Sequence, residues 1–358
     1  MTRASDARPI LITGGAGFIG SNLADRLAGE GQSVIVYDAL SRPGVERNLA
    51  WLRGRHGNKI NAIIGDIRDE DEVVRAAADA KAVFHFAAQV AVTTSLVDPR
   101  EDFDVNVRGT INLLDAVRTR GRRVPVIFAS TNKVYGDLSD LPFTSIDDRY
   151  EPASMIAGRG INEDRSLDFH TPYGCSKGAA DQYVLDYARS FGVPSAVFRM
   201  SCIYGQRQMG TEDQGWVAHF LIRALEDQPI SIYGDGRQVR DILDVHDAVT
   251  AYTRALSNID RVAGRAFNLG GGPANAVSLL QLIDEMRAVT GRDVDLKFED
   301  WRQGDQRWYV SDTQAARTAL GLPEPRDWRE GVARLAGWLA EERGFELHEE
   351  RQLASAAE

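Results

Sequence analysis

The chain has 358 residues, of which 43% are hydrophobic and 26% are charged, and its formal net charge is −10. This composition is typical of a soluble globular protein, and the negative charge argues against a general nucleic-acid binder, which needs a basic face to neutralise phosphates. The apolar stretches have the length of strands, far below the roughly 20 residues that span a bilayer, so we expect a cytoplasmic protein without a membrane partner. Two cysteines, Cys175 and Cys202, lack metal-ligand or redox spacing, which predicts neither a disulfide nor a metal site.

Short apolar runs alternate with helical patterns in the first half of the chain. The predicted strands are 10–13, 34–37, 62–64, 82–86, 126–129 and 195–199, and the predicted helices are 18–29, 45–54, 69–78, 99–120 and 173–192. This alternation predicts an α/β protein with a Rossmann-type, doubly wound parallel sheet.

The second half has a mixed pattern. We expect helices near 214–226, 244–259, 278–290 and 326–343, with short strands at 230–233 and 266–269. These patterns divide the chain into a Rossmann domain over 1–205 and a smaller mixed α/β C-terminal substrate portion over 206–343, with the return of a late strand and helix to the first domain left open. The tail 344–358 is expected to fray.

One segment, 136–170, is rich in Asp, Gly, Pro and Arg and shows no periodicity. It is too long for an idle connection in a compact domain, so we expect a functional loop near the active site.

A glycine turn directly follows the first predicted strand, with Gly14, Gly17 and Gly20 at three-residue spacing before a helix. A tight turn, the close approach of a pyrophosphate and close helix–strand packing each exclude a Cβ, and the helix N-terminus attracts anions. Asp38 ends the second strand, where a carboxylate can bind ribose hydroxyls and repel a ribose phosphate. The turn therefore predicts NAD rather than NADP as the cofactor.

Further cofactor contacts are predicted at the ends of the next two strands. Asp66 and Ile67 follow the third strand and are candidates for adenine contact, and Ala87 and Ala88 follow the fourth and are small enough for the cofactor to pass.

Tyr173 and Lys177 stand four residues apart at a helix start, so their side chains share one face. Thr131 follows the strand 126–129 at the edge of the sheet where ligands bind. We expect Thr131 to orient a substrate hydroxyl, Tyr173 to move its proton and Lys177 to tune the tyrosine. The ammonium and a nicotinamide ring are expected to lower the pKa of the phenol.

Together, the glycine turn, Asp38, Thr131 followed by 134–136, the Tyr173–Lys177 pair, and the elements 106–114 and 232–241 resemble the extended short-chain dehydrogenase/reductase family over nearly the whole chain. The resemblance implies an NAD-dependent enzyme acting on a nucleotide sugar. Further implied cofactor contacts are Phe18, Ile19, Gln89, Asn106, Met200, Tyr173 and Lys177.

The residues after Thr131 bear on the reaction. Family dehydratases carry an Asp-Glu pair there as acid and base, whereas this chain has Asn132 and Lys133, which disfavours elimination. Stretches 89–95, 130–136, 167–183, 204–208, 213–216 and 238–241 are similar to one branch, the CDP-paratose 2-epimerases, also called CDP-tyvelose 2-epimerases. The similarity implies epimerisation at sugar carbon 2 of a nucleoside-diphosphate hexose through a transient ketone.

Substrate-binding residues follow from this resemblance and from the ability of guanidinium groups to bind diphosphate oxygens. Ser201 and Cys202 stand where many 4-epimerases carry Phe-Asn, which favours a differently oriented sugar. The candidates are Gln89, Thr131, Asn132, Lys133, Ser201, Cys202, Arg207, Arg240 and Arg302.

Alternatives stay open at this point. They are a 4-epimerase using the same three catalytic residues, a decarboxylase or reductase acting on a sugar nucleotide, and an NAD-binding regulatory protein with a retired site. The family resemblance implies a homodimer or homotetramer formed through the helices 99–120 and 173–192.

Overall fold

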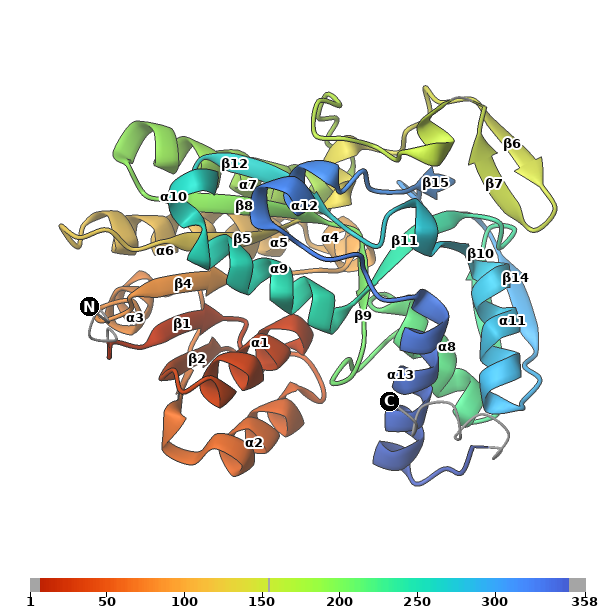
Figure 1. Ribbon diagram of the computed structural model, residues 1–358, viewed down its shortest axis with the longest axis horizontal. Helices are drawn as coiled ribbons and strands as arrows, with labels where there is room; N and C mark the ends of the chain where they lie inside the picture. Colours follow the sequence, from red (N-terminus) through yellow and green to blue (C-terminus); the bar gives the residue numbers. More distant parts are fainter. Residues whose placement is uncertain (1–6, 154, 348–358) are drawn as a thin grey trace.

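The core of the computed structural model, which describes residues 7–153 and 155–347, is a seven-stranded parallel sheet in the order β12-β8-β5-β4-β1-β2-β3 (Figure 1). Its strands are β1 (Ile10–Thr13), β2 (Val34–Asp38), β3 (Ile60–Ile64), β4 (Ala82–His85), β5 (Val126–Thr131), β8 (Ser195–Met200) and β12 (Arg265–Leu269). Apolar runs make strands here because a parallel sheet is buried on both faces. The predicted doubly wound sheet is confirmed.

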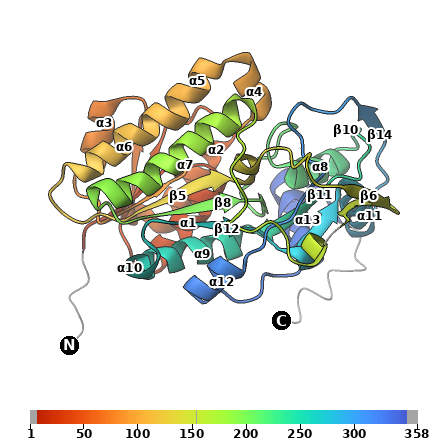
Figure 2. The same ribbon diagram turned by 90° about the horizontal axis from the view of Figure 1, so that it is seen from above.

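Helices cover both faces of this sheet (Figure 2). One face carries α1 (Phe18–Gly29), α2 (Val45–His56), α9 (Val245–Ser257), α10 (Ile259–Val262) and α12 (Gln314–Leu320). The other carries α3 (Glu70–Ala76), α4 (Val92–Val97), α5 (Pro99–Phe103), α6 (Gly109–Arg118) and α7 (Thr171–Phe191). Leu23 and Leu27 of α1 and Leu113 and Val117 of α6 are buried, each set against its own face of the sheet.

The single helix predicted over 99–120 is divided in the structure. A π-helical turn, Asp104–Arg108, separates α5 from α6. Thr110 donates a hydrogen bond from Oγ1 to the Asn106 carbonyl (2.6 Å) within this irregular stretch. π-Helical turns often mark functional sites because they redirect a side chain, and this one carries Asn106.

A second, smaller unit lies beside the carboxyl ends of the sheet strands (Figure 1). Its helices are α8 (Trp216–Leu225), α11 (Leu279–Thr290) and α13 (Trp328–Arg343). Its strands are β9 (Cys202–Tyr204), β10 (Ile230–Tyr233), β11 (Val239–Asp244), β13 (Ala276–Ser278), β14 (Leu296–Glu299) and β15 (Trp308–Tyr309). β11 pairs with β9, β13 and β15, and β10 pairs with β14.

Four elements of the predicted substrate portion belong to the sheet unit instead. β12 pairs in parallel with β8, and α9, α10 and α12 bury Ala248, Ile259 and Leu320 in the apolar cluster that also contains β1 and α1. The chain thus returns to the first unit with three helices and a strand, because the strand partner of a short apolar run is decided by tertiary pairing and not by its neighbours in sequence. The boundary at 205/206 itself stays a prediction.

The segment 136–170 differs from the expected functional loop. It contains a hairpin of β6 (Phe143–Ile146) and β7 (Arg149–Pro152) that packs on the smaller unit. Tyr150 donates hydrogen bonds from its backbone N to Arg237 O (2.9 Å) and from its hydroxyl to Asp235 Oδ2 (2.6 Å). No described residue of the segment lines the cavity between the two units. Its contacts with Arg237 and Asp235 instead stabilise the smaller unit.

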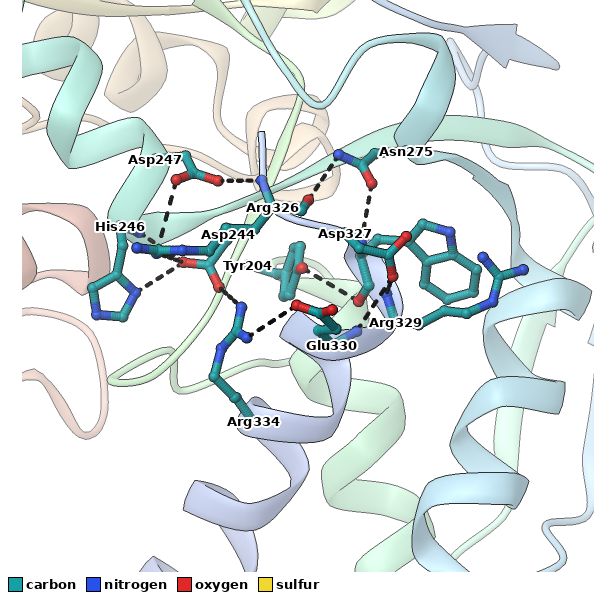
Figure 3. Close-up of polar contacts among 11 residues, drawn as sticks. Tyr204, Asp244, His246, Asp247, Asn275, Arg326, Asp327, Arg329, Glu330 and Arg334 are labelled. Atoms are coloured by element: carbon teal, nitrogen blue, oxygen red, sulfur yellow. Dashed lines mark hydrogen bonds and ion pairs between the residues drawn. The ribbon is translucent and has the colours of Figure 1, made fainter. Parts of the chain in front are cut away.

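A polar cluster around Asp244 joins α13 to the junction of β11 and α9 (Figure 3). The Asp244 carboxylate is 4% exposed and accepts hydrogen bonds from His246 N (2.8 Å), Arg326 (3.4 Å) and Arg334 (3.2 Å). Burial raises the pKa of Asp244, but the hydrogen bonds from His246 and the nearby arginines outweigh it and hold the pKa below its usual value. The cluster therefore ties the C-terminal helix to the sheet unit.

The predicted tail 344–358 lies mostly outside the described residues, which end at 347. Among the helices that the structure describes, none is both long enough and apolar enough to cross a membrane. The described residues likewise contain no group of three or more His, Cys, Asp or Glu side chains that could hold a metal ion.

Candidate active site

A cavity of about 420 Å³ lies where the sheet unit meets the smaller unit. Thr131 and Tyr173 line it from the sheet unit, and Arg240, Arg302 and Asp305 line it from the smaller one. Phe18, Ile19 and Met200, predicted to contact the cofactor, also line this cavity. The carboxyl edge of a parallel sheet is where such folds bind ligands.

The glycines of the turn between β1 and α1 serve two different functions. A Cβ on Gly14, which has φ +67°, would lie 2.7 Å from Ala87 N, and a Cβ on Gly20 would lie 2.2 Å from Gly14 O. A Cβ on Gly17 would meet only Gly14 O, at 3.1 Å. Gly17 is the N-cap of α1 and no side chain caps this helix. Gly14 and Gly20 are thus required by the turn itself, whereas Gly17 leaves the helix N-terminus open to a pyrophosphate.

Asp38 is fixed beside this turn. Its Oδ2 accepts a hydrogen bond from Ala16 N (2.9 Å) and its Oδ1 accepts one from Leu40 N (2.9 Å). Burial raises the pKa of the Asp38 carboxyl, and these backbone hydrogen bonds act in the opposite direction. Each oxygen keeps a further lone pair with which to accept from a ribose hydroxyl, so the turn and Asp38 together fit NAD.

Asp66 and Ile67 lie at the end of β3 but are engaged with the protein. The Asp66 carboxylate pairs with Arg68 (2.6 Å), and hydrogen bonding from Arg68 lowers the pKa of Asp66. Ile67 is buried, and a Cβ on Gly109 would lie 2.6 Å from its Cγ2. Their predicted contacts with adenine stay predictions, and the side chain of Ile67 serves the core.

The side chain of Asn106 does not line the cavity, and its hydrogen bonds go to residues beside the cavity. The side chain is 1% exposed; Oδ1 accepts from Gln89 N (2.9 Å), and Nδ2 donates to Gln89 O (3.0 Å) and Ser176 Oγ (3.0 Å). The Gln89 amide in turn donates to Ala91 O (2.8 Å) and Asp102 Oδ1 (3.1 Å). The hydrogen-bonding groups expected to contact cofactor are therefore used to fix the loop after β4 against α7.

The structure brings the three predicted catalytic residues together. Thr131 ends β5; its hydroxyl accepts from Lys133 N (3.2 Å) and is hydrogen-bonded to Tyr173. Tyr173 lies in the first turn of α7, where its backbone N donates to Ser95 Oγ (3.2 Å). Lys177, one turn later, donates from Nζ to Ala129 O (2.6 Å) and lies 4.2 Å from the Phe128 ring centroid.

The electrostatics of this group differ from the expectation. Burial raises the pKa of Tyr173 to about 12; the Thr131 hydrogen bond lowers it and the Asp102 charge raises it. Burial lowers the pKa of Lys177 to about 7, against the charges of Asp181 and Asp102. Burial therefore outweighs any lowering of the tyrosine pKa by the protein's own charges, because desolvation penalises a phenolate and an ammonium alike. The predicted effect of a nicotinamide ring stays a prediction.

Three predicted cations face the cavity. Arg240 donates to Asp305 Oδ1 (2.6 Å), and Lys133 Nζ lies 3.6 Å from the same oxygen and donates to Gly304 O (3.1 Å). Arg302 lies 3.8 Å from the centroid of the Tyr233 ring. Burial lowers the pKa of Lys133, which Asp305 counteracts. Arg302 pairs with Glu212 (3.3 Å) and Asp213 (3.5 Å). Arg240 and Lys133 instead share one carboxylate, so the excess of positive charge that an anionic ligand would meet is local to these two residues.

Arg207, a candidate for the diphosphate, lies outside the cavity, and its predicted role stays a prediction. Its side chain lies 4.2 Å from the Trp51 ring centroid, 5.3 Å from that of Trp338 and 3.4 Å from Glu342 Oε1. An arginine stacks on aromatic faces as readily as it binds phosphate, so Arg207 connects α2 to α13.

The remaining substrate candidates line the cavity, but some of their polar atoms already make hydrogen bonds within the protein. Asn132 donates from Nδ2 to Gln306 Oε1 (3.0 Å), and Ser201 donates from Oγ to Asp241 O (2.8 Å). Cys202 also lines the cavity, and burial raises the pKa of its thiol. Asn132 and Ser201 therefore shape the cavity wall as much as they present polar atoms to it.

Several residues of the site were missed from sequence. Tyr233 lies within 232–241, and Thr93 and Ser95 lie within 89–95, stretches that carried the family resemblance, so a signal existed but no single side chain stood out; Asp305 was also missed. No pattern in the sequence indicated Asp102, because a single acidic residue in an amphipathic helix is usually exposed to solvent.

This fold and the glycine turn with Asp38 define a class: enzymes with a Rossmann unit that binds NAD. The family model described as "NAD dependent epimerase/dehydratase family" matches residues 10–270. The chain belongs to this family, and NAD is its cofactor.

Individual relatives agree. The chain is 43% identical to the CDP-paratose 2-epimerase of Salmonella typhi over 340 residues, covering 92% of this chain and 99% of the relative. The UDP-glucose 4-epimerase of Thermotoga maritima, solved with UDP-glucose, is 30% identical, with a TM-score of 0.80 and coverage of 94% and 99%. The UDP-glucuronic acid 4-epimerase of Bacillus cereus, solved with UDP-glucuronic acid and NAD, is 26% identical, with a TM-score of 0.80 and coverage of 93% and 99%.

Proposed function

We propose that this protein is an isomerase that inverts carbon 2 of a nucleoside-diphosphate hexose, with a CDP-activated dideoxyhexose such as CDP-paratose as the first substrate to test. The observation that carries the proposal is the Thr131–Tyr173–Lys177 group at a cavity with Lys133 beside it. The 43% identity to a CDP-paratose 2-epimerase over nearly the full length of both chains supports the choice of carbon 2.

The chemistry assigns one task to each catalytic residue. NAD, when bound, takes a hydride from the sugar carbon and returns it to the other face of the resulting ketone. Tyr173 removes the proton of the substrate hydroxyl and gives it back, and Thr131 holds that hydroxyl through its own. Lys177, fixed by Ala129 O, supplies positive charge one helical turn from the tyrosine. Turnover then needs no net oxidant.

Substrate binding is assigned to the cations of the smaller unit. Arg240 and Arg302, with Lys133, are proposed to hold the diphosphate, since guanidinium groups bind its oxygens in pairs. Gly17 and Asp38 are proposed to hold the cofactor pyrophosphate and ribose.

Elimination is disfavoured by the same geometry. No carboxylate follows Thr131; Lys133 is bound to Gly304 and Asp305, and Asn132 to Gln306. Epimerisation at carbon 4 is the second candidate, because solved 4-epimerases share the fold at TM-scores near 0.80.

The protein is also proposed to form a homodimer or homotetramer in the cytoplasm. Apolar side chains are exposed on the helices α4 to α7, and they are Leu96, Val97, Phe103, Tyr183 and Phe191. Such a patch supports an interface between copies of the chain. The free thiol of exposed Cys175 supports a reducing compartment.

The test incubates the purified protein with CDP-, UDP-, GDP- and dTDP-hexoses, CDP-paratose and CDP-tyvelose among them, in ordinary and deuterated water. Proton NMR is expected to show inversion at carbon 2 without deuterium at that carbon, because the same hydride is returned. Inversion at carbon 4 would instead select the second candidate. Absence of inversion in every sugar would refute both.

A further inference from the structure

Asp102 is a buried carboxyl that the proposed chemistry does not use. It lies in α5, which packs beside the catalytic helix α7 (Figure 2), and it is 0% exposed. Its Oδ1 accepts from Gln89 Nε2 (3.1 Å) and Asn106 Nδ2 (3.3 Å), whereas Oδ2 has no hydrogen-bond partner among the described residues. The described residues also contain no ion pair of this carboxylate.

A buried carboxylate in this state needs a compensating positive charge or a proton. Lys177 is 4% exposed and lies on α7, which packs against α5, so its side chain is enclosed in the same interior as Asp102. The charge of Lys177 lowers the pKa of Asp102 against the larger effect of burial, which raises it.

The other charged groups around Lys177 are already balanced. Asp181, on the same helix, raises the pKa of Lys177 more than Asp102 does, but it has a cation of its own: it pairs with Arg199 (3.0 Å) and accepts from Ser130 Oγ (2.8 Å). His85 faces Lys177 from β4, but burial lowers the pKa of His85 to about 3, so it stays neutral above that pH. Tyr173 remains protonated at neutral pH. Among the described groups, Asp102 is left as the acid without a cation of its own.

Hydrogen bonds link this carboxyl to the residue that precedes Lys177. Asn106 donates to Ser176 Oγ (3.0 Å) and to Asp102 Oδ1 (3.3 Å), and Ser176 donates to Tyr173 O (3.2 Å). The π-helical turn that begins at Asp104 turns Asn106 toward α7. The break in the helix, the two polar residues and the carboxyl thus form one connected group behind the catalytic pair.

We propose that Asp102 is a positioning residue that acts through Lys177: its carboxylate supplies the counter-charge that keeps the lysine ammonium at Ala129 O, one helical turn from Tyr173. Its consequence for turnover rests on the proposed function, but its effect on Lys177 does not.

The sign of the effect follows from the charges. Asp102 raises the pKa of Lys177 and the pKa of Tyr173. Replacement of the carboxylate by an amide of equal size is therefore expected to lower both pKa values. Activity that requires an ammonium at Lys177 and an ionisable Tyr173 would then lie at lower pH at both ends of its profile.

The experiment compares Asp102→Asn with Asp104→Asn. Asp104 lies two residues further on, is 38% exposed and pairs with Arg108, so it is a matched control. The chain has five lysines, which makes the spectrum of protein labelled with [ε-¹³C]lysine simple; the Lys177 signal is identified by its loss in Lys177→Arg. In Asp102→Asn the titration midpoint of Lys177 is expected to fall by about one pH unit, as for the loss of a nearby opposite charge. Asp104→Asn should leave it unchanged.

The pH profile of kcat is the second readout. Both limbs are expected to move to lower pH in Asp102→Asn, whereas a merely structural role would lower kcat or stability without moving them. An unchanged Lys177 midpoint overturns the proposal. If Asp102→Asn does not fold, Asp102→Leu replaces it, since leucine has a similar size and removes both the charge and the unpartnered Oδ2, and the same fall of the Lys177 midpoint is expected. Failure of the wild-type protein to epimerise any sugar counts against the proposed function alone, because the lysine titration does not depend on turnover.

Discussion

At the scale of single residues, burial decides the charge states of the site. His85 shows this most simply: Nδ1 lies 2.7 Å from Thr13 Oγ1 and Nε2 lies 3.0 Å from Thr110 Oγ1, so a neutral ring satisfies both hydroxyls. Burial and the Lys177 charge lower the pKa of His85 to about 3.

This shift makes stability depend on pH. The unfolded chain binds a proton at His85 below about pH 6.5, whereas the folded chain does not, so the free energy of unfolding falls as the pH drops from about 6.5 toward 3. Between pH 7 and pH 5 we expect this residue to account for a loss of about 2 kcal/mol. Urea denaturation at both pH values measures it, and His85→Gln should flatten the dependence over this range. An equally steep dependence in the variant would contradict the assignment.

Tyr173 is the residue on which turnover depends most directly. Tyr173→Phe keeps the ring but removes the proton carrier and is expected to lower kcat by about 100-fold or more, with KM nearly unchanged. Tyr183→Phe, on the exposed face of the same helix, is the control. Steady-state kinetics on the sugar identified by NMR decide the matter, and unchanged turnover would remove Tyr173 from its role.

At the scale of elements, the β1–α1 turn combines two requirements that sequence spacing cannot separate. Gly20 has no room for a Cβ because the Gly14 carbonyl would be 2.2 Å away, whereas Gly17 has room within the protein. The two glycines therefore make different predictions.

Gly20→Ala is expected to destabilise the fold by about 3 kcal/mol, because a Cβ there must displace the backbone. Gly17→Ala is expected to keep its melting temperature within a few degrees and to weaken NAD binding by roughly 10-fold, since a methyl group lies where the pyrophosphate approaches. Thermal unfolding and calorimetric titration with NAD measure both. Equal effects of the two substitutions on stability would show that Gly17 also serves packing.

Most elements were predictable, because apolar periodicity is local. The predicted strand at 10–13 and helix at 18–29 coincide with β1 and α1. β11 was missed although it carries Arg240, since a short strand with polar residues has no pattern of its own and is defined by its neighbours β9, β13 and β15. The π-helical turn was missed as well, because no pattern in the sequence distinguishes its residues from those of an ordinary helix.

At the scale of the whole molecule, two groups of contacts hold the two units together. The Asp244 cluster joins α13 to the start of α9 (Figure 3), and Arg207, between Trp51 and Trp338, joins α13 to α2. The cations that face the cavity are a separate set, which agrees with the proposed position of the substrate between the units.

Arg207→Met and Arg302→Met test this division of roles. Arg207→Met is expected to lower the stability by about 1 kcal/mol with KM unchanged, since it loses two aromatic contacts. Arg302→Met is expected to raise KM about 10- to 100-fold, because one or two charge-assisted hydrogen bonds to substrate are lost. Its stability is expected to fall by no more than about 1 kcal/mol, because the contacts with Tyr233 and Glu212 are partly exposed. Thermal unfolding with steady-state kinetics separates the two, and a raised KM in Arg207→Met would return this arginine to the substrate site.

The sequence by itself determined the parallel sheet, the glycine turn with Asp38, and the Thr131–Tyr173–Lys177 group, because each depends on spacing along a few residues and on the regular ends of strands. Tertiary structure decided the rest. β12 entered the sheet by pairing with β8, Arg207 stacked on tryptophans outside the cavity, and Asn106 turned to brace α7. The charges of Tyr173, Lys177 and Asp102 also depend on it, because desolvation is set by everything packed around a group, and no local pattern records that.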